Sequence, residues 1–200
     1  FTLLPDLRTY FGSSKGKFKY SLGAIAGFDG YVYYDLYYSF KTSCLAASDI
    51  DHIQGVDRLN PSQLINVRTD LPLYLKQRAV TFPELYIRKI WNTGRGTFFK
   101  LATGYFEIEY AGVAAEFLYY PVNGSVALSF EGALLKKRKH RGLGLTDKIS
   151  KYRGFTRTYV PFFGNQYFVN LYYDWREINT EFRIKARQFL AKDYGIRYEI

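Results

Sequence analysis

The clearest feature of the chain is an alternation of apolar and polar positions with a period of two. It is strongest over residues 17–28, 31–41, 166–176 and 181–187. Successive side chains of a β-strand point to opposite faces, so each segment is predicted to be a strand with one apolar and one polar face. Weaker strands are expected at 5–11, 65–76, 83–92, 97–108, 112–120, 125–135, 155–163 and 195–200.

Short stretches rich in Gly, Asn, Ser and Pro separate most of these segments. Such residues favour tight turns, so the strands should be joined mainly as hairpins. Two connections are longer: 42–64, which contains Cys44 and His52, and 136–153. We therefore predict an all-β fold, an antiparallel up-and-down β-barrel of about twelve long strands, or part of one. No linker divides residues 1–200, so we expect a single domain, excised from a longer chain because it contains no methionine.

The length of the strands bears on the environment of the barrel. A strand that crosses a membrane needs about 9–11 residues, whereas the mean strand of a soluble protein has about 5–6. The segments 17–28, 31–41, 65–76, 125–135 and 166–176 all reach the membrane range. Aromatic residues lie near several strand ends, where an interfacial girdle would be. The pattern favours a membrane barrel with an apolar outer face and leaves open a soluble β-rich fold with an apolar interior.

Composition narrows the classes of function. Aromatic residues make up 20% of the chain, which is too many for a disordered protein. The net charge of +10 favours polyanionic partners such as phosphorylated lipid headgroups, acidic polysaccharide or nucleic acid. A single cysteine, Cys44, excludes an internal disulfide framework and a cysteine-based zinc site, and two histidines are too few for a histidine-rich metal site. We expect no metal and no cofactor.

Four segments resemble one protein family. They are Lys15–Gly23 (KGKFKYSLG), Val67–Lys76 (VRTDLPLYLK), Ala102–Pro121 (ATGYFEIEYAGVAAEFLYYP) and Phe189–Gly195 (FLAKDYG). In order and spacing they are similar to the YjbH-type family, the exopolysaccharide- and capsule-associated outer-membrane proteins of Gram-negative bacteria. The resemblance runs from about residue 15 to the end of the chain.

The resemblance implies a β-barrel in the outer membrane that takes part in exopolysaccharide export or assembly. It implies no catalysis, and members of the family are longer than this chain. The partners it implies are outer-membrane lipid and lipopolysaccharide, an exopolysaccharide and other secretion proteins, with no nucleic acid.

Several residues are candidates for contact with a sugar chain in the lumen. On the predicted strand 65–76, Arg68 and Asp70 share the polar face. They are candidates to contact a translocating sugar chain, or to form a salt bridge that holds the shape of the barrel. Lumen-facing tyrosines could stack on sugar rings or fill space; these are Tyr33, Tyr37 and Tyr172.

Three acidic residues, Glu107, Glu109 and Glu116, raise the question of a glycosidase. Nothing else in the sequence supports catalysis, because both histidines fall in predicted loops and no nucleophile motif is present. We therefore expect no enzyme. The acidic residues are predicted to pair across strands with basic residues of the segment 181–187, namely Arg183, Lys185 and Arg187.

The connection 136–153 begins with a basic run, which we predict to be a polyanion-binding loop. Its candidate residues are Lys136, Lys137, Arg138, Lys139 and Arg141. Between long strands, such a run would meet lipopolysaccharide phosphates or an acidic polysaccharide, or it would be a solvated loop with no ligand.

These observations predict a non-enzymatic outer-membrane barrel protein that takes part in exopolysaccharide or capsule secretion. A porin-like lumen lined by basic and aromatic residues would give the sugar chain a surface on which to slide. Two alternatives stay open: an outer-membrane scaffold that conducts nothing, and a soluble β-rich carbohydrate-binding module. Outward exposure of the alternate apolar residues would favour the membrane; these include Phe18, Leu22, Leu36, Phe40, Val169 and Leu171.

Overall fold

The computed structural model describes residues 1–13, 16–50, 66–77, 80–153 and 156–200. Within this part, one antiparallel sheet has the strand order β1-β2-β3-β4-β5-β6-β7-β11-β12-β13, and the short β8 pairs with β7. The strands of this sheet are β1 (Thr2–Ser13), β2 (Gly16–Tyr33), β3 (Leu36–Ser48), β4 (Thr81–Gly94), β5 (Thr97–Tyr105), β6 (Tyr110–Tyr119), β7 (Val126–Arg138), β8 (Leu145–Thr146), β11 (Gly164–Trp175), β12 (Thr180–Gln188) and β13 (Tyr194–Glu199).

Consecutive strands are neighbours in the sheet, so the predicted all-β, up-and-down architecture is confirmed. The one departure is the connection from β7 to β11. There the chain leaves the main sheet and forms a separate two-stranded hairpin, β9 (Lys148–Arg153) and β10 (Thr156–Pro161). Two short helical segments complete the described elements, α2 (Leu71–Leu75) and the 3₁₀ turn η2 (Arg176–Ile178).

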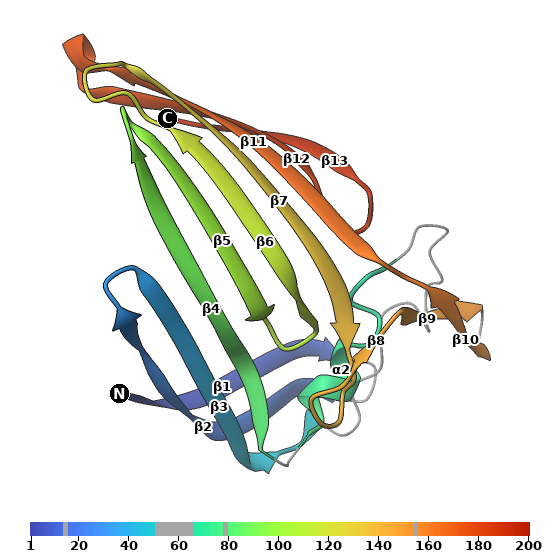
Figure 1. Ribbon diagram of the computed structural model, residues 1–200. Helices are drawn as coiled ribbons and strands as arrows, with labels where there is room; N and C mark the ends of the chain where they lie inside the picture. Colours follow the sequence, from blue (N-terminus) through green and yellow to red (C-terminus); the bar gives the residue numbers. More distant parts are fainter. Residues whose placement is uncertain (14–15, 51–65, 78–79, 154–155) are drawn as a thin grey trace.

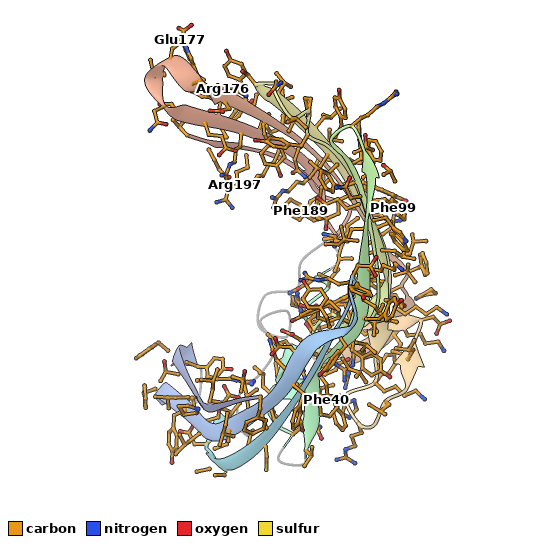
Figure 2. All side chains as sticks on the ribbon, turned by 60° about the vertical axis from the view of Figure 1, so that its left-hand side comes forward. Phe40, Phe99, Arg176, Glu177, Phe189 and Arg197 are labelled. Carbon is orange, nitrogen blue, oxygen red and sulfur yellow. The ribbon has the colours of Figure 1, made fainter. Side chains whose placement is uncertain are left out.

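The sheet is strongly curved and open (Figure 1). Seen along its edge, it forms a crescent in which β1–β3 lie in one limb and β11–β13 in the other (Figure 2). In the described part, β1 and β13 each pair with a single neighbour, so the sheet is a partial barrel rather than a closed one. The curvature gives the sheet a concave and a convex side.

The convex face is apolar across the width of the sheet. Rows of directly opposed residues show this best, and one row runs Phe99, Phe117, Phe130, Val169, Ala186 and Ile196 over six strands. Figure 2 shows Phe99 on the convex side and Arg197 on the concave side. The four residues at the start of this row are between 38% and 47% exposed. A soluble monomer rarely leaves so extended an apolar surface uncovered.

Six apolar residues were chosen from the sequence because their outward exposure would favour a membrane barrel, and none of the six is fully buried. Phe18, Leu22, Val169 and Leu171 are exposed, and Leu36 and Phe40 are half-buried. In the described part of the chain no second sheet covers this face, since the two-stranded hairpin is the only other sheet.

The concave face carries the polar positions of the same strands. The row next to the apolar one contains Lys100, Glu116, Glu131, Phe168 and Arg187, again directly opposed. A further row pairs Ser129 with Asn170 and continues to Lys185 and Arg197. Because the side-chain period of a strand is two, the register that exposes the apolar rows places these polar rows together on the concave side.

One predicted strand, 65–76, is wrong. The described part of this segment, from residue 66, forms two consecutive turns and α2, held by hydrogen bonds from the amides of Leu71 and Leu73 to the carbonyl oxygens of Arg68 and Asp70. The physical reason is Pro72, which has no amide hydrogen for a sheet ladder but fits the first turn of a helix. Arg68 and Asp70 are therefore not on a strand face.

Several strand ends also differ from the prediction. The strand predicted at 31–41 contains the hairpin turn at Tyr34 and Asp35, so that 31–33 belong to β2 and 36–41 to β3. The strand predicted at 97–108 ends at Tyr105, and residues 106–109 make the turn into β6. The strand predicted at 125–135 continues to Arg138, so three residues assigned to the basic loop lie in β7. Cys44, predicted in a loop, is an exposed residue of β3, and His52 lies outside the described residues.

The buried apolar core is small and lies at one end of the concave face. It consists of Tyr110, Ala133, Leu135, Ile149 and Phe162, with Val67, Phe106 and Leu190 among the residues packed against it. The core therefore joins β6 and β7 to the β9–β10 hairpin and to the segment before α2. The rest of the sheet has no apolar core on its concave side among the described residues.

Candidate functional site

Residues 66–77, which we name the docked segment, lie on the concave side beside the ends of β5–β7 (Figure 1). Two hydrogen bonds to the carbonyl oxygen of Val67 hold its start, one from the Tyr110 hydroxyl (2.6 Å) and one from Lys137 Nζ (3.0 Å). Both partners are strand residues that are almost fully buried. The segment is thus fixed to the sheet and is not a free loop.

The centre of this attachment is Glu109, whose side chain is fully buried. Its Oε1 accepts a hydrogen bond from Lys137 Nζ at 2.8 Å, and its Oε2 accepts one from the Arg68 guanidinium at 2.8 Å. Arg68 also donates to Glu107 at 2.8 Å. Burial alone would lower the pKa of Arg68, but its bonds to the two glutamates outweigh that effect and raise the pKa above its ordinary value.

A second set of contacts ties the docked segment to the β9–β10 hairpin. Asp70 accepts hydrogen bonds from the Arg157 guanidinium (2.9 Å) and from the backbone amide of Ser150 (3.1 Å). Lys137 Nζ lies 3.8 Å from Oδ2 of the same carboxylate. Asp70 and Glu109 are therefore both neutralised by cations from other elements, which is what buried charges require.

Tyr74 and Arg138 close the end of the site. The Tyr74 hydroxyl donates to the carbonyl oxygen of Arg138, and the Arg138 guanidinium donates to the carbonyl oxygens of Phe82 and Glu107 at 2.7 and 2.8 Å. Burial raises the pKa of Tyr74, and the charges of Glu109 and Asp70 raise it further. The phenol is therefore a neutral hydrogen-bond donor at ordinary pH.

Next to the docked segment the concave face is hollowed. A pocket of about 410 Å³ lies over β4–β7 and β11, within the size range of small-molecule sites. Its polar wall includes Arg68, Arg88, Lys100, Glu107, Glu131 and Gln166, and its aromatic wall includes Tyr86, Phe106 and Tyr110. Such a mixture of hydrogen-bonding groups and ring faces suits a polar ligand with some apolar surface, such as a sugar.

The charged rows extend from the pocket toward β13. Arg183, Lys185 and Arg197 lie beside Glu199, with the Lys185 ion pair at 2.7 Å and the Arg197 ion pair at 2.7 Å. Arg187 stacks over the Phe168 ring at 5.2 Å, and within the described part of the chain it forms no ion pair with a carboxylate. The concave face therefore presents many exposed charged groups, most of them already paired.

The acidic residues are paired, but not as predicted. Glu107 and Glu109 are in the turn between β5 and β6 and bind Arg68 and Lys137, rather than basic residues of β12. Glu116 pairs with Lys100 on the neighbouring strand. The prediction failed because it assumed that the strand ran through Glu107, whereas the turn at 106–109 carries both acids under the docked segment.

The three predicted tyrosines are not brought together. Tyr37 lies under the Arg88 guanidinium, whose central carbon is 4.3 Å from the ring centre. Tyr172 is directly opposite Arg183, in the limb of β11–β13. Tyr33 is 67% exposed at the end of β2, where its ring packs against Tyr34.

The predicted polyanion-binding loop is wrong in part. Lys137 and Arg138 are buried strand residues that hold the docked segment and the neighbouring backbone, so they are not available to a polyanion. Lys136, Lys139 and Arg141 are exposed, as a binding surface requires. Continuing the alternation of β7 through the basic run would have placed Lys137 on the same face as Ala133 and Leu135, but the burial of Arg138 depends on contacts with distant segments.

Other residues of the site were missed by the sequence reasoning. Arg157 binds Asp70 across 87 positions of the chain, and Tyr74 and Tyr110 anchor the docked segment. Arg88 and Lys100 could have been found, because both occupy polar positions of strands that alternate. Nothing in the sequence marks the pairing of Arg157 with Asp70.

Among the described residues, no group of three or more His, Cys, Asp or Glu side chains could hold a metal ion. In the same part of the chain, no helix is long and apolar enough to cross a membrane.

Comparison with known proteins shows which family the chain belongs to. A family model described as "Exopolysaccharide biosynthesis protein YbjH" matches residues 1–200. The chain belongs to the YjbH exopolysaccharide biosynthesis family. It is 24% identical over 204 residues to "Uncharacterized lipoprotein YjbH" of Escherichia coli (strain K12), an alignment that covers 100% of the chain and 27% of that relative. The chain thus spans about a quarter of the length of this relative. No solved structure is significantly similar to it.

Two of the four segments that resemble the YjbH family meet at the site. Val67–Lys76 is most of the docked segment, and Ala102–Pro121 contains the turn 106–109 and β6. Arg68 of the first segment binds Glu107 and Glu109 of the second. The resemblance to the YjbH family and the buried charge cluster therefore fall on the same part of the fold.

Proposed function

We propose that this chain is part of an outer-membrane β-barrel that takes part in exopolysaccharide or capsule secretion or assembly without catalysing a reaction. In this proposal the convex face contacts lipid, and the concave face contacts the polysaccharide. The observation that carries the proposal is the division of one continuous sheet into an apolar convex face and a charged concave face.

The strand lengths support a membrane location. β3, β4, β7 and β11 have 13, 14, 13 and 12 residues, and a strand of about 9–11 residues suffices to cross a bilayer. The apolar rows of the convex face continue from strand to strand, as in the outer surface of membrane barrels. Family membership supports the link to exopolysaccharide.

The state of the acidic residues supports a non-enzymatic role. A glycosidase needs one carboxyl group that can donate a proton and a second that can act as a base or nucleophile. Glu107 and Glu109 are both bound by Arg68, and Glu109 also binds Lys137, so both side chains are already engaged in ion pairs within the protein.

The partners follow from the same surfaces. We propose that lipid covers the convex rows and that the exposed Lys136, Lys139 and Arg141 meet lipopolysaccharide phosphates or acidic polysaccharide. Further partners would be other exopolysaccharide-secretion proteins, which the family assignment supports.

One pair of adjacent residues in β6 tests the location. Phe117 is on the convex face and Leu118 on the concave face. In the full-length protein, Phe117→Arg should reduce the amount of folded protein in the outer-membrane fraction strongly, because an arginine facing the middle of the bilayer costs about 2–4 kcal/mol. Leu118→Arg is the matched control and should be tolerated better. Equal effects of the two changes, or recovery of the unaltered protein in the soluble fraction, would refute the proposal.

A scaffold that conducts nothing is a second candidate function, and one observation favours it. The docked segment lies on the concave side and is held there by buried ion pairs. Conductance of the full-length protein in planar bilayers separates the two roles. A conduit gives currents that acidic polysaccharide blocks, whereas a scaffold gives none, even when Asp70→Asn weakens the attachment of the segment.

A further inference from the structure

We infer that the pocket on the concave face binds a carboxylated sugar unit of an acidic polysaccharide, with Arg88 receiving the carboxylate. The inference rests on the proposed function and deepens it, because it names the chemical class of the polysaccharide and the residues that select it. It uses the pocket over β4–β7 and β11 described above.

The floor of the pocket is a row of small residues. Ala102, Ala114 and Ala133 are directly opposed on β5, β6 and β7, and the row ends with Arg88 on β4 and Gln166 on β11. Neighbouring strands are about 4.8 Å apart, so the three alanines span roughly 10 Å and the strands that carry the two long polar side chains lie roughly 19 Å apart along the sheet. The pocket volume of about 410 Å³ is large enough for a sugar ring.

Arg88 has an uncompensated charge at the edge of this pocket. Within the part of the chain that the structure describes, its guanidinium forms no ion pair, and its buried Nε has no hydrogen-bond partner. Among the described residues, the guanidinium makes a cation–π contact with the ring of Tyr37. By contrast, Arg68 and Lys100, the other cations of the pocket, are held by glutamates. A guanidinium with free donors binds a carboxylate through two parallel hydrogen bonds.

The opposite wall supplies hydrogen-bond acceptors for sugar hydroxyls. Glu131 lines the pocket and, like Arg88, forms no ion pair among the described residues. It would accept hydrogen bonds from sugar hydroxyls, as the amide oxygen of Gln166 can. Tyr86 and Phe106, whose ring centres are 5.8 Å apart, offer ring faces to the carbon–hydrogen side of a sugar. A carboxylated sugar carries a carboxylate, hydroxyl donors and an apolar ring face on one unit.

The test is titration calorimetry on the full-length protein in detergent micelles. The probes are a tetrasaccharide that contains glucuronic acid and the same tetrasaccharide after reduction of its carboxyl group to an alcohol. The acidic probe should bind roughly tenfold or more tightly than the reduced probe, because a hydrogen bond to a charged group is lost on reduction. Arg88→Gln should lose that preference.

Arg197→Gln is the matched control, since it removes the same charge from the same concave face at a residue outside the pocket. It should leave binding unchanged. Ala114→Leu keeps every charge and fills the floor, so it should weaken binding of both probes and keep the inference testable if Arg88→Gln does not fold. The far-ultraviolet dichroism of each variant reports whether the sheet is formed.

Equal affinity for the two probes, or equal losses in Arg88→Gln and Arg197→Gln, would overturn the inference. Absence of binding to either probe would overturn it as well. None of these results bears on whether the protein is in the outer membrane, because the Phe117→Arg and Leu118→Arg variants test that independently. The proposed function can thus hold while the carboxylated-sugar site fails.

Discussion

Glu109 offers the sharpest test of how the docked segment is held. Its carboxylate is fully buried and binds Lys137 at 2.8 Å and Arg68 at 2.8 Å, and the Lys137 side chain is 2% exposed. The substitution Glu109→Gln keeps the shape but removes the negative charge. Lys137 is then left in the interior with Asp70 at 3.8 Å as its nearest carboxylate.

The expected cost follows from the desolvation of the charge that is left behind. Breaking a buried ion pair by removal of one partner costs about 3–5 kcal/mol, because the remaining charge is uncompensated. Removing both charges costs less, since neither member of this pair is then left as an uncompensated buried charge. Glu109→Gln and Lys137→Met should each therefore destabilise the full-length protein by about this amount, and the double variant by clearly less than their sum.

Equilibrium unfolding by guanidinium in detergent micelles measures these differences. The matched control is Glu181→Gln with Arg183→Gln, an exposed pair at 2.8 Å on β12, which should leave the unfolding midpoint unchanged. Single variants at Glu109 and Lys137 that unfold like the control would refute the reasoning. So would strict additivity in the double variant, because it would mean that the two side chains do not interact in the folded protein.

Three further predictions concern the same region. Asp70→Asn should make residues 66–77 of the full-length protein more susceptible to limited proteolysis, because the bond to the β9–β10 hairpin loses its charge; unchanged cleavage would contradict the attachment. Burial raises the pKa of Tyr74, so the unfolded chain releases this proton first and stability should fall as the pH rises above about 10; Tyr74→Phe should reduce that fall in unfolding experiments. Gly104→Ala should lower the yield of folded protein, because Gly104 has a φ of +134° and an added Cβ would press on the backbone of β4, whereas Gly132→Ala, with its nearest neighbour at 3.5 Å, should be tolerated.

The alternation of the sequence was enough to predict the sheet. Residues 17–28 and 181–187 lie wholly in strands, 166–176 lies in β11 as far as Trp175, and 31–41 is divided between β2 and β3 by the turn at Tyr34 and Asp35. The hairpin order follows from the short turns between the strands. This succeeds because the period of two is a local property of the chain, and neighbouring strands joined by short turns must pair. The same local rule failed at 65–76, where one proline outweighs an apolar alternation.

The contacts of the site residues were predicted less well from the sequence than the strands were. Sequence spacing placed Arg68 and Asp70 on a shared strand face and linked Glu107 and Glu109 to β12. In the structure these residues form one cluster with Lys137 and Arg157, which lie far along the chain. Ion pairs between distant segments depend on how the chain returns to the sheet, which the local pattern does not specify.

The sequence by itself determined that the chain forms a two-faced antiparallel sheet, because side chains alternate along every strand whatever the rest of the molecule does. Only the tertiary structure decided which basic residues are buried and which are free. In the sequence, Lys137 and Arg138 look like solvent-exposed members of a basic run, but they hold the docked segment. Arg88, beside a floor of alanines, has no ion pair with any residue that the structure describes. The physical reason is that the burial and pairing of a charge depend on segments brought together from across the chain, and the cost of an unpaired buried charge then selects the arrangement.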